Sequence, residues 1–176
     1  MKLNEKEFLD VELQMGICYS NEDFKNLAHQ TADYVKSHNP KLVIDYGCGT
    51  GAYSQAMFEK GLNVMAQDVS KAHRDYVKAN HSGVKVIARP VKSDFMCFIE
   101  VAEHMTDEEI KTAISLIEPE KILFSSTPEY TDQDEEWNHI NIKQENEWVF
   151  FWENLGYTLI DYPKTPTPWA LMLEKI

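Results

Sequence analysis

The sequence predicts an α/β fold in which a mostly parallel sheet lies between two layers of helices. Short apolar runs alternate with segments of helical periodicity from position 42 onward, and a glycine-rich loop joins the first run to the helix after it. The chain has 176 residues, of which 43% are hydrophobic, and this length and composition are sufficient to form one compact hydrophobic core. We therefore expect a single domain over residues 1–176, with 1–40 as a helical cover and 41–176 as the core.

The helical cover is predicted from an amphipathic pattern that Asn39 and Pro40 end. Apolar positions recur there at helical spacing: Phe24, Leu27, Ala28, Thr31 and Val35. Ser20 with Asp23 resembles a capping box that would start this helix. The segment before it is helix-prone but weakly patterned, so its conformation stays open, with a lid over a cofactor as one option.

The core is predicted as seven strands and four further helices. Strands are expected at 42–46, 63–67, 84–88, 95–99, 122–125, 157–161 and 169–173. Helices are expected at 52–60, 70–79, 106–117 and 148–155. Thr106 with Glu109 forms a capping box for the third of these helices, and Trp148, Phe151 and Trp152 give the last one an apolar stripe.

Charge and cysteine content restrict the function. The 29 acidic residues against 17 basic ones give a net charge of -12, which makes nucleic acid an unlikely partner and favours small or uncharged ligands. Cys18, Cys48 and Cys97 form no CxxC pair, which argues against a disulfide framework and a thiolate zinc site. With no apolar leader and no membrane span in the sequence, we expect a cytoplasmic protein without a membrane partner.

The loop after the first strand carries the strongest local signal. Gly47, Gly49 and Gly51 stand at alternate positions, where the missing Cβ lets the backbone turn and approach a ligand closely. A looser dinucleotide-binding pattern, G-x-G-x-x-A, also fits. Asp45 separates the two interpretations, because a carboxylate at this place repels a pyrophosphate but pairs with a cationic amino-acid group.

The segment 43–51, Val-Ile-Asp-Tyr-Gly-Cys-Gly-Thr-Gly, resembles the first motif of class I S-adenosylmethionine-dependent methyltransferases. Asp68, at the end of the second strand, corresponds to the acid that binds both ribose hydroxyls in that family. The resemblance continues through 94–104 and 124–128, and extends to ubiquinone-biosynthesis O-methyltransferases. The acid that commonly follows strand three in that family is missing, since Ala88 to Lys92 runs almost directly into strand four.

The resemblance implies a Rossmann-like three-layer sandwich. Its sheet has seven mostly parallel strands in the order 3-2-1-4-5-7-6, closed by an antiparallel C-terminal hairpin. It also implies a set of cofactor-binding residues: Asp45, Gly47, Cys48, Gly49, Gly51, Asp68 and Glu100.

Glu100, Glu103 and His104 follow the fourth strand, on the same rim of the sheet as the glycine loop. His139 follows the fifth strand and reaches this rim if the acidic loop 131–136 folds over it. Together these four residues make a candidate set for magnesium, manganese or zinc, and Glu-x-x-Glu-His with a later His resembles metal-assisted 2′-O-methyltransferases of small RNAs. Without a metal, His104 or His139 is the candidate catalytic base. The acidic run Asp132, Asp134, Glu135 and Glu136 is interpreted as a solvated loop.

These features predict transfer of a methyl group from S-adenosylmethionine to a small-molecule or sugar-like acceptor, at oxygen. An RNA-end or protein methyltransferase is an alternative. A degenerate S-adenosylmethionine-binding regulatory module is the non-enzymatic alternative, because intact binding residues do not establish turnover. The acceptor and the oligomeric state are not specified by the sequence.

Overall fold

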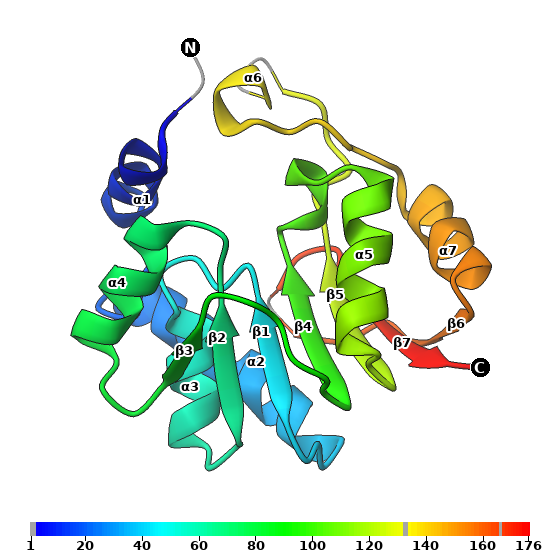
Figure 1. Cartoon of the computed structure of the whole chain (residues 1–176), viewed down its shortest axis with the longest axis horizontal. Coiled ribbons are helices and arrows are strands. Elements are labelled where there is room, and N and C mark those ends of the chain that lie inside the picture. The colour runs from blue at the N-terminus through cyan, green and yellow to red at the C-terminus, as the bar shows by residue number, and fades with distance from the viewer. Residues whose placement is uncertain (1–2, 132–133, 166) are drawn as a thin grey trace.

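The computed structural model describes residues 3–131, 134–165 and 167–176. Within them, one seven-stranded sheet has the order β3-β2-β1-β4-β5-β7-β6 (Figure 1). The strands are β1 Val43–Tyr46, β2 Val64–Gln67, β3 Lys85–Ile87, β4 Phe95–Ile99, β5 Lys121–Ser125, β6 Tyr157–Asp161 and β7 Leu171–Lys175. The first five pair in parallel, and β7 is antiparallel to both β5 and β6. This confirms the expected strand order and the closing hairpin.

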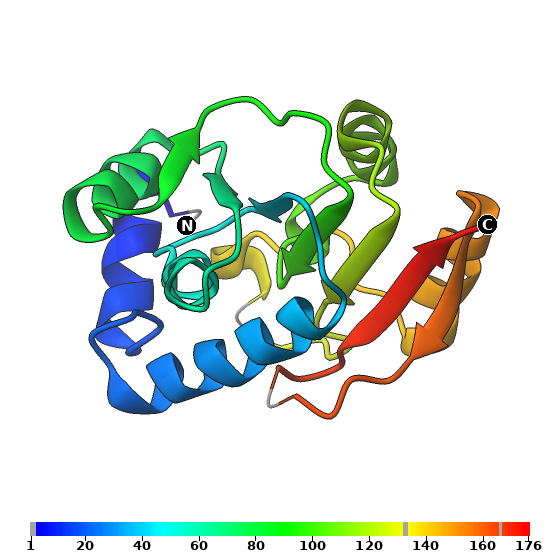
Figure 2. The same ribbon diagram turned by 90° about the horizontal axis from the view of Figure 1, so that it is seen from below.

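Helices cover both faces of the sheet, because successive strand residues point to opposite sides. The covering helices are α2 Glu22–Ser37, α3 Ala52–Glu59, α4 Lys71–Asn80, α5 Asp107–Ile117 and α7 Glu145–Asn154, whereas α1 Glu5–Gln14 and α6 Asp134–Trp137 lie beyond the carboxyl ends of the strands (Figure 1). In β1, Val43 packs into a core cluster with α2 and α3, whereas Ile44 packs into one with α5 and α7. Figure 2 shows α2 on one side of the sheet and α5 on the other, so the three-layer prediction is confirmed.

The helix starts agree with the sequence in one case and differ in another. Thr106 and Glu109 form the expected capping box of α5. The expected capping box of Ser20 and Asp23 is wrong: Asn21 is the N-cap of α2, and its side-chain oxygen accepts from the backbone N–H groups of Asp23 and Phe24. An amide oxygen caps as well as a hydroxyl, so the start shifts by one residue.

The structure also gives the conformation of two segments that the sequence left open or placed differently. The N-terminal segment left open above is helix α1, with a capping box between Asn4 and Glu7 and only Leu9 buried. Strand β7 begins at Leu171 rather than at 169, because Trp169 has a left-handed φ of 52° that breaks the extended backbone. Pro166, in the connection before it, lies outside the described residues.

Among the described residues, no helix has both the length and the apolar character that a membrane crossing requires.

Candidate functional site

The glycine loop connects β1 to α3 at the carboxyl edge of the sheet, and each of its three glycines has a left-handed φ at which another residue would be strained. Gly47 has a φ of 69°, and a Cβ there would lie 2.5 Å from Cγ2 of Val101. Gly51 has a φ of 77°, and its Cβ would lie 2.7 Å from Cγ2 of Val77 on α4. The loop therefore needs glycine for its left-handed conformation and for its close packing.

Asp68 lies at the carboxyl end of β2 with its carboxylate fixed against the glycine loop. Its Oδ2 accepts a hydrogen bond from the Gly49 backbone N–H at 3.0 Å, and its Oδ1 accepts one from Ser70 N–H at 2.8 Å. Burial raises the pKa of Asp68, against the opposing effects of nearby His73 and of these N–H groups. Each carboxylate oxygen keeps a further lone pair for a ligand.

Asp45 and Cys48 are buried beneath the loop. Asp45 is only 3% exposed, and the Ser54 hydroxyl of α3 donates a hydrogen bond to its carboxylate. Burial raises the pKa of Asp45 to about 6, although the Ser54 hydrogen bond opposes the shift. Burial also raises the pKa of the Cys48 thiol well above its ordinary value, so the thiol is not a nucleophile at neutral pH.

Two adjoining cavities open around this loop. The first, of about 590 Å³, is lined by Asp68 and by apolar side chains that include Val101, Met105 and Leu116. The second, of about 560 Å³, lies beside Glu103 and His139. The residues that line both are Phe8, Glu12, Gly47, Gly49, Glu100, His104 and Trp137. No lysine or arginine is among the described residues that line either cavity.

The rim beyond β4 brings together three of the four expected metal or catalytic residues. Glu103 and His104 belong to the 3-10 helix η1, Ala102–His104, and ligand atoms of Glu103, His104 and His139 lie within 4.8 Å of one another. The Ser126 hydroxyl donates to Oε2 of Glu103 at 3.0 Å. Glu100 lies outside this group, before η1, where it has a left-handed φ of 53° and accepts a hydrogen bond from the Ser125 hydroxyl.

Burial sets the protonation of this rim. Burial, with a smaller contribution from the neighbouring His139, lowers the pKa of His104 to about 4, so His104 is neutral at physiological pH. Burial also raises the pKa of Glu103, and the charge of Glu100 adds to that shift. The two carboxyls therefore favour a shared proton, or a cation beside them.

His139 is oriented by Asp134, which is a correction to the solvated-loop prediction. The Nδ1 atom of His139 lies 3.1 Å from Oδ1 of Asp134, and Thr131 N–H donates to Oδ2 of Asp134 at 2.7 Å. These bonds hold the Asp134 side chain at 15% exposure instead of leaving it in solvent. Asp132 and the side chains of Glu135 and Glu136, in the same acidic run, lie outside what the structure describes.

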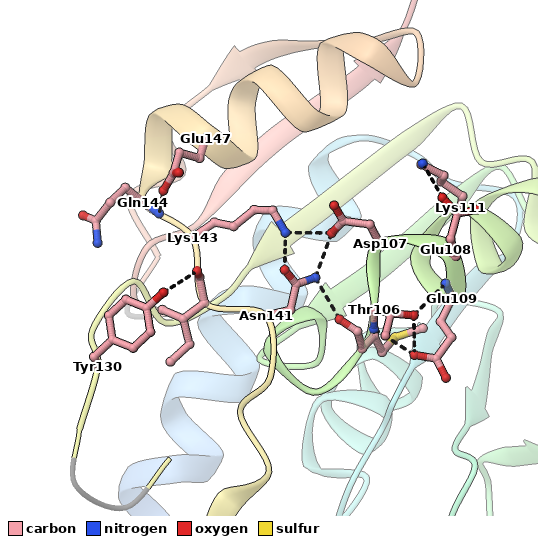
Figure 3. A network of polar contacts seen from close by, with 12 residues as sticks. Thr106, Asp107, Glu108, Glu109, Lys111, Tyr130, Asn141, Lys143, Gln144 and Glu147 are labelled. Carbon is pink, nitrogen blue, oxygen red and sulfur yellow. Dashed lines mark hydrogen bonds and ion pairs between the residues drawn. The ribbon is translucent and has the colours of Figure 1, made fainter. Parts of the chain in front are cut away.

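The segment after His139 is fastened to the start of α5 by a polar network (Figure 3). The Asn141 amide donates to the Met105 carbonyl at 2.8 Å and to Asp107 Oδ1 at 2.9 Å. Lys143 Nζ donates to the same Asp107 oxygen at 2.7 Å. The backbone N–H groups of Ile140 and Asn141 donate to the Glu103 carbonyl at 2.7 and 3.0 Å. These contacts place His139 beside His104, with ring centroids 4.8 Å apart.

Comparison with known families identifies the family of this chain. The family described as Methyltransferase domain matches residues 19–160, which is more than half of the chain. The chain belongs to this methyltransferase-domain family. The resemblance to class I methyltransferases noted in the sequence is thereby confirmed.

Two curated relatives of this methyltransferase-family chain act on different kinds of atom. The ubiquinone biosynthesis O-methyltransferase of Actinobacillus pleuropneumoniae serotype 7 (strain AP76) is 30% identical over 106 residues, covering 49% of this chain and 45% of that protein. The N-demethylindolmycin N-methyltransferase of Streptomyces griseus is 35% identical over 77 residues, covering 43% and 31%. The chain thus spans less than half the length of these relatives.

Solved structures share the fold of the methyltransferase-family chain at low sequence identity. Magnesium protoporphyrin IX methyltransferase from Synechocystis PCC 6803, with bound S-adenosylmethionine, has a TM-score of 0.64 at 16% identity, covering 100% of this chain and 86% of that one. The 1,6-didemethyltoxoflavin-N1-methyltransferase of Burkholderia thailandensis has a TM-score of 0.61 at 17% identity, covering 99% and 92%.

For the N-terminal segment the sequence left a lid over the cofactor open as an option, but it did not identify the residues that this segment contributes to the site. Phe8 and Glu12 of α1 line both cavities, and the Phe8 ring contacts those of His104 and Trp137 at centroid distances of 5.8 and 5.3 Å. Asp134 was also missed. The capping residue Asn4 with Glu7 was a usable signal for α1, but no local pattern shows where a short helix docks.

Proposed function

We propose that this chain is an S-adenosylmethionine-dependent methyltransferase that acts on a small-molecule acceptor, at oxygen. The observation that carries the proposal is the pair of cavities that adjoin at the glycine loop, one beside Asp68 and the other beside His139. Methyl transfer requires two ligands whose reacting atoms meet in line, and two pockets with a common wall supply that arrangement.

On the cofactor side, each candidate residue has a role that suits its environment. Asp68 accepts from the ribose hydroxyls, and the loop from Gly47 to Gly51 lets the backbone approach the methionine portion. The methionine portion crosses the glycine loop toward the second cavity, where Asp45, which lines that cavity, and Glu100, which lines both, supply negative charge for the ammonium group. Cys48 contributes its small size and its backbone. The apolar lining of the first cavity, which includes Met105 and Leu116, suits the adenine ring.

On the acceptor side, the lining favours a small molecule without negative charge. The second cavity is walled by apolar and aromatic side chains: Met15, Phe24, Leu27, Trp137 and Trp169. Its described lining offers buried carboxyls and no lysine or arginine, so a phosphate or carboxylate group there would be unpaired. RNA ends are therefore poor acceptors, in agreement with the net charge of -12.

His139 is the better candidate base of the two histidines. With Nδ1 directed at Asp134, its Nε2 is left to take the proton of an acceptor hydroxyl. The acceptor oxygen then attacks the methyl carbon, the carbon–sulfur bond breaks, and its electron pair stays on sulfur. His104, whose pKa is lowered to about 4, accepts hydrogen bonds but is a weak base.

A divalent metal on Glu103, His104 and His139 is a second proposal, favoured by their convergence within 4.8 Å. Neutral imidazoles and a buried carboxyl without a cationic partner suit such an ion, and Ser126 and Asp134 would orient the ligands. A bound metal supplies Lewis acidity that lowers the pKa of an acceptor hydroxyl.

The cofactor assignment is tested by calorimetry with S-adenosylmethionine, S-adenosylhomocysteine and NAD. We expect the first two to bind and NAD to fail. Asp68→Ala should weaken S-adenosylmethionine binding by about 1 to 3 kcal/mol, because the ribose loses a charged acceptor. Asp75→Ala, which removes an exposed carboxylate from α4, is the matched control and should bind as the wild type does.

Turnover is tested with methyl-labelled S-adenosylmethionine and extract fractions of small molecules. Label transferred to a small acceptor supports the enzyme, whereas tight binding without transfer supports the regulatory module. A chelator should abolish the transfer, and magnesium, manganese or zinc should restore it, if the metal proposal holds. If the chelator does not change the rate of methyl transfer, the metal proposal fails and His139 remains the proposed base.

A further inference from the structure

Helix α1 forms one wall of both cavities, yet little apolar surface holds it in place. Leu9 is the one residue of the helix that is buried. Instead, two carboxylates of α1 bond to the first turn of α4: Glu5 Oε2 accepts from the Lys71 backbone N–H at 2.9 Å, and Glu12 Oε2 lies 2.7 Å from His73 Nε2. Figure 1 shows α1 beside α4, at the end of the molecule where α6 also lies.

Glu12 reaches from this helix to the glycine loop. A Cβ placed on Gly49 would lie 3.2 Å from Glu12 Oε1, so this oxygen faces the loop while Oε2 is held by His73. Glu12 is also one of the residues that line both cavities, together with Glu100 on the β4 side. The sulfonium joins the nucleoside and methionine portions of the cofactor, so a cofactor that crosses from Asp68 in the first cavity to Asp45 in the second places its sulfonium at the junction, where Glu12 and Glu100 line both cavities.

The electrostatics of this junction favour a cation. Even with His73 protonated, the carboxylates of Glu5, Glu12 and Asp68 leave the cluster around it negatively charged. No lysine or arginine is among the described lining residues, and Arg74, which donates to the Asp68 carbonyl at 2.9 Å from outside the cavities, offsets only part of that charge. Burial raises the pKa of Glu12 against the opposing effect of His73, which shows the cost of holding this carboxylate without a positive ligand.

We propose that Glu12 is a cofactor-binding residue that selects the positively charged sulfonium cofactor over its product, whose sulfur is uncharged. His73 acts as a positioning residue, because its hydrogen bond holds Glu12 and α1 at the cavity. The inference rests on the proposed function. It assigns to Glu12 a role in product release, since loss of the sulfonium charge removes the attraction that holds the ligand.

The test is calorimetric binding of S-adenosylmethionine, S-adenosylhomocysteine and an amine analogue whose protonated nitrogen replaces the sulfonium. Glu12→Gln keeps the shape and hydrogen-bonding capacity of the side chain but removes its charge. It should raise the Kd of both cationic ligands about tenfold and that of S-adenosylhomocysteine less than about threefold. Asp10→Asn, which removes an exposed charge from the same helix, is the matched control and should leave all three Kd values unchanged.

His73→Asn separates charge from position. It loosens α1 but leaves the Glu12 carboxylate, so it should weaken the three ligands to a similar extent. Equal weakening of all ligands by Glu12→Gln, no weakening, or the same selective change in Asp10→Asn would each overturn the inference. If the wild-type chain binds neither cofactor nor product, the proposed function itself fails; if it binds both and Glu12→Gln keeps the wild-type ratio, only this inference fails.

Discussion

On the cofactor side of the site, Asp45 and Asp68 stand at or near the ends of adjacent strands and bond to groups 9 and 19 residues away in sequence. On the acceptor side, His139 belongs to no strand and is held by Asp134, the Glu103 carbonyl and the Asn141 network. The first arrangement follows from parallel strands that end at one edge. The second arrangement depends on loop segments that are held by side-chain hydrogen bonds. Loop sequences vary more readily than strands, so this side can differ between enzymes with different acceptors.

This difference predicts that the two sides respond separately to mutation. A change on the acceptor side should alter the chemical step and spare cofactor affinity, whereas a change on the cofactor side should alter binding and stability.

The largest effect is expected for His139→Ala. Removing the proposed base should lower kcat by about 10²- to 10⁴-fold, because general-base catalysis contributes on that scale. The Kd for S-adenosylmethionine should stay within a factor of two or so, since the glycine loop and Asp68 are untouched. Single-turnover rates with labelled cofactor measure the first quantity, and calorimetry measures the second.

His104→Ala is the comparison for that experiment. If His104→Ala lowers kcat by about 10²-fold or more while His139→Ala lowers it only slightly, the base is His104 and the assignment is reversed. If both variants lose cofactor binding, the two sides of the site are not separable.

An intermediate effect on stability is expected for Asp45→Asn on the cofactor side. Burial raises the pKa of Asp45 from 3.8 to about 6, so the folded chain holds this proton over a pH range in which the unfolded chain has lost it. The wild-type free energy of unfolding should therefore fall as pH rises from 3.8 to 6, and the loss should persist above 6. Asp45→Asn removes this dependence and should stabilise the protein at pH 7.5 by about 1 to 3 kcal/mol.

Urea unfolding at pH 4, 5, 6 and 7.5 measures this dependence, with Asp10→Asn as an exposed control. The same Asp45 variant should bind S-adenosylmethionine more weakly, since the ammonium group loses a carboxylate. A variant that is destabilised at every pH would show that Asp45 serves the fold through its bond to Ser54.

The same contrast explains what the sequence could predict. The strand order, the glycine loop and the position of Asp68 follow from local patterns and from the resemblance they carry. The closeness of His104 and His139 was a conditional expectation, since it required the segment 131–136 to fold over the rim. The roles of Glu12 and Asp134 were missed, because each arises from contacts between elements distant in sequence or within a loop that has no periodicity.

The smallest effect is expected for Asn141→Ala, which tests whether the network in Figure 3 positions His139. The variant loses the bonds to the Met105 carbonyl and Asp107, but the backbone bonds from residues 140 and 141 to the Glu103 carbonyl remain. We expect kcat to fall about tenfold, because a small displacement of a catalytic group is costly even when the group itself is intact. The Kd for S-adenosylmethionine should not change.

Asn154→Ala is the matched control, since its amide makes the same kind of bond, to the Phe150 carbonyl at 2.8 Å, on the far helix α7. A purely structural role for Asn141 would lower the midpoint of unfolding and leave kcat per folded molecule unchanged. A positioning role lowers kcat at temperatures where the variant is fully folded. If Asn141→Ala and Asn154→Ala lower kcat equally, activity follows overall stability. The Asn141 network would then have no specific role in positioning His139.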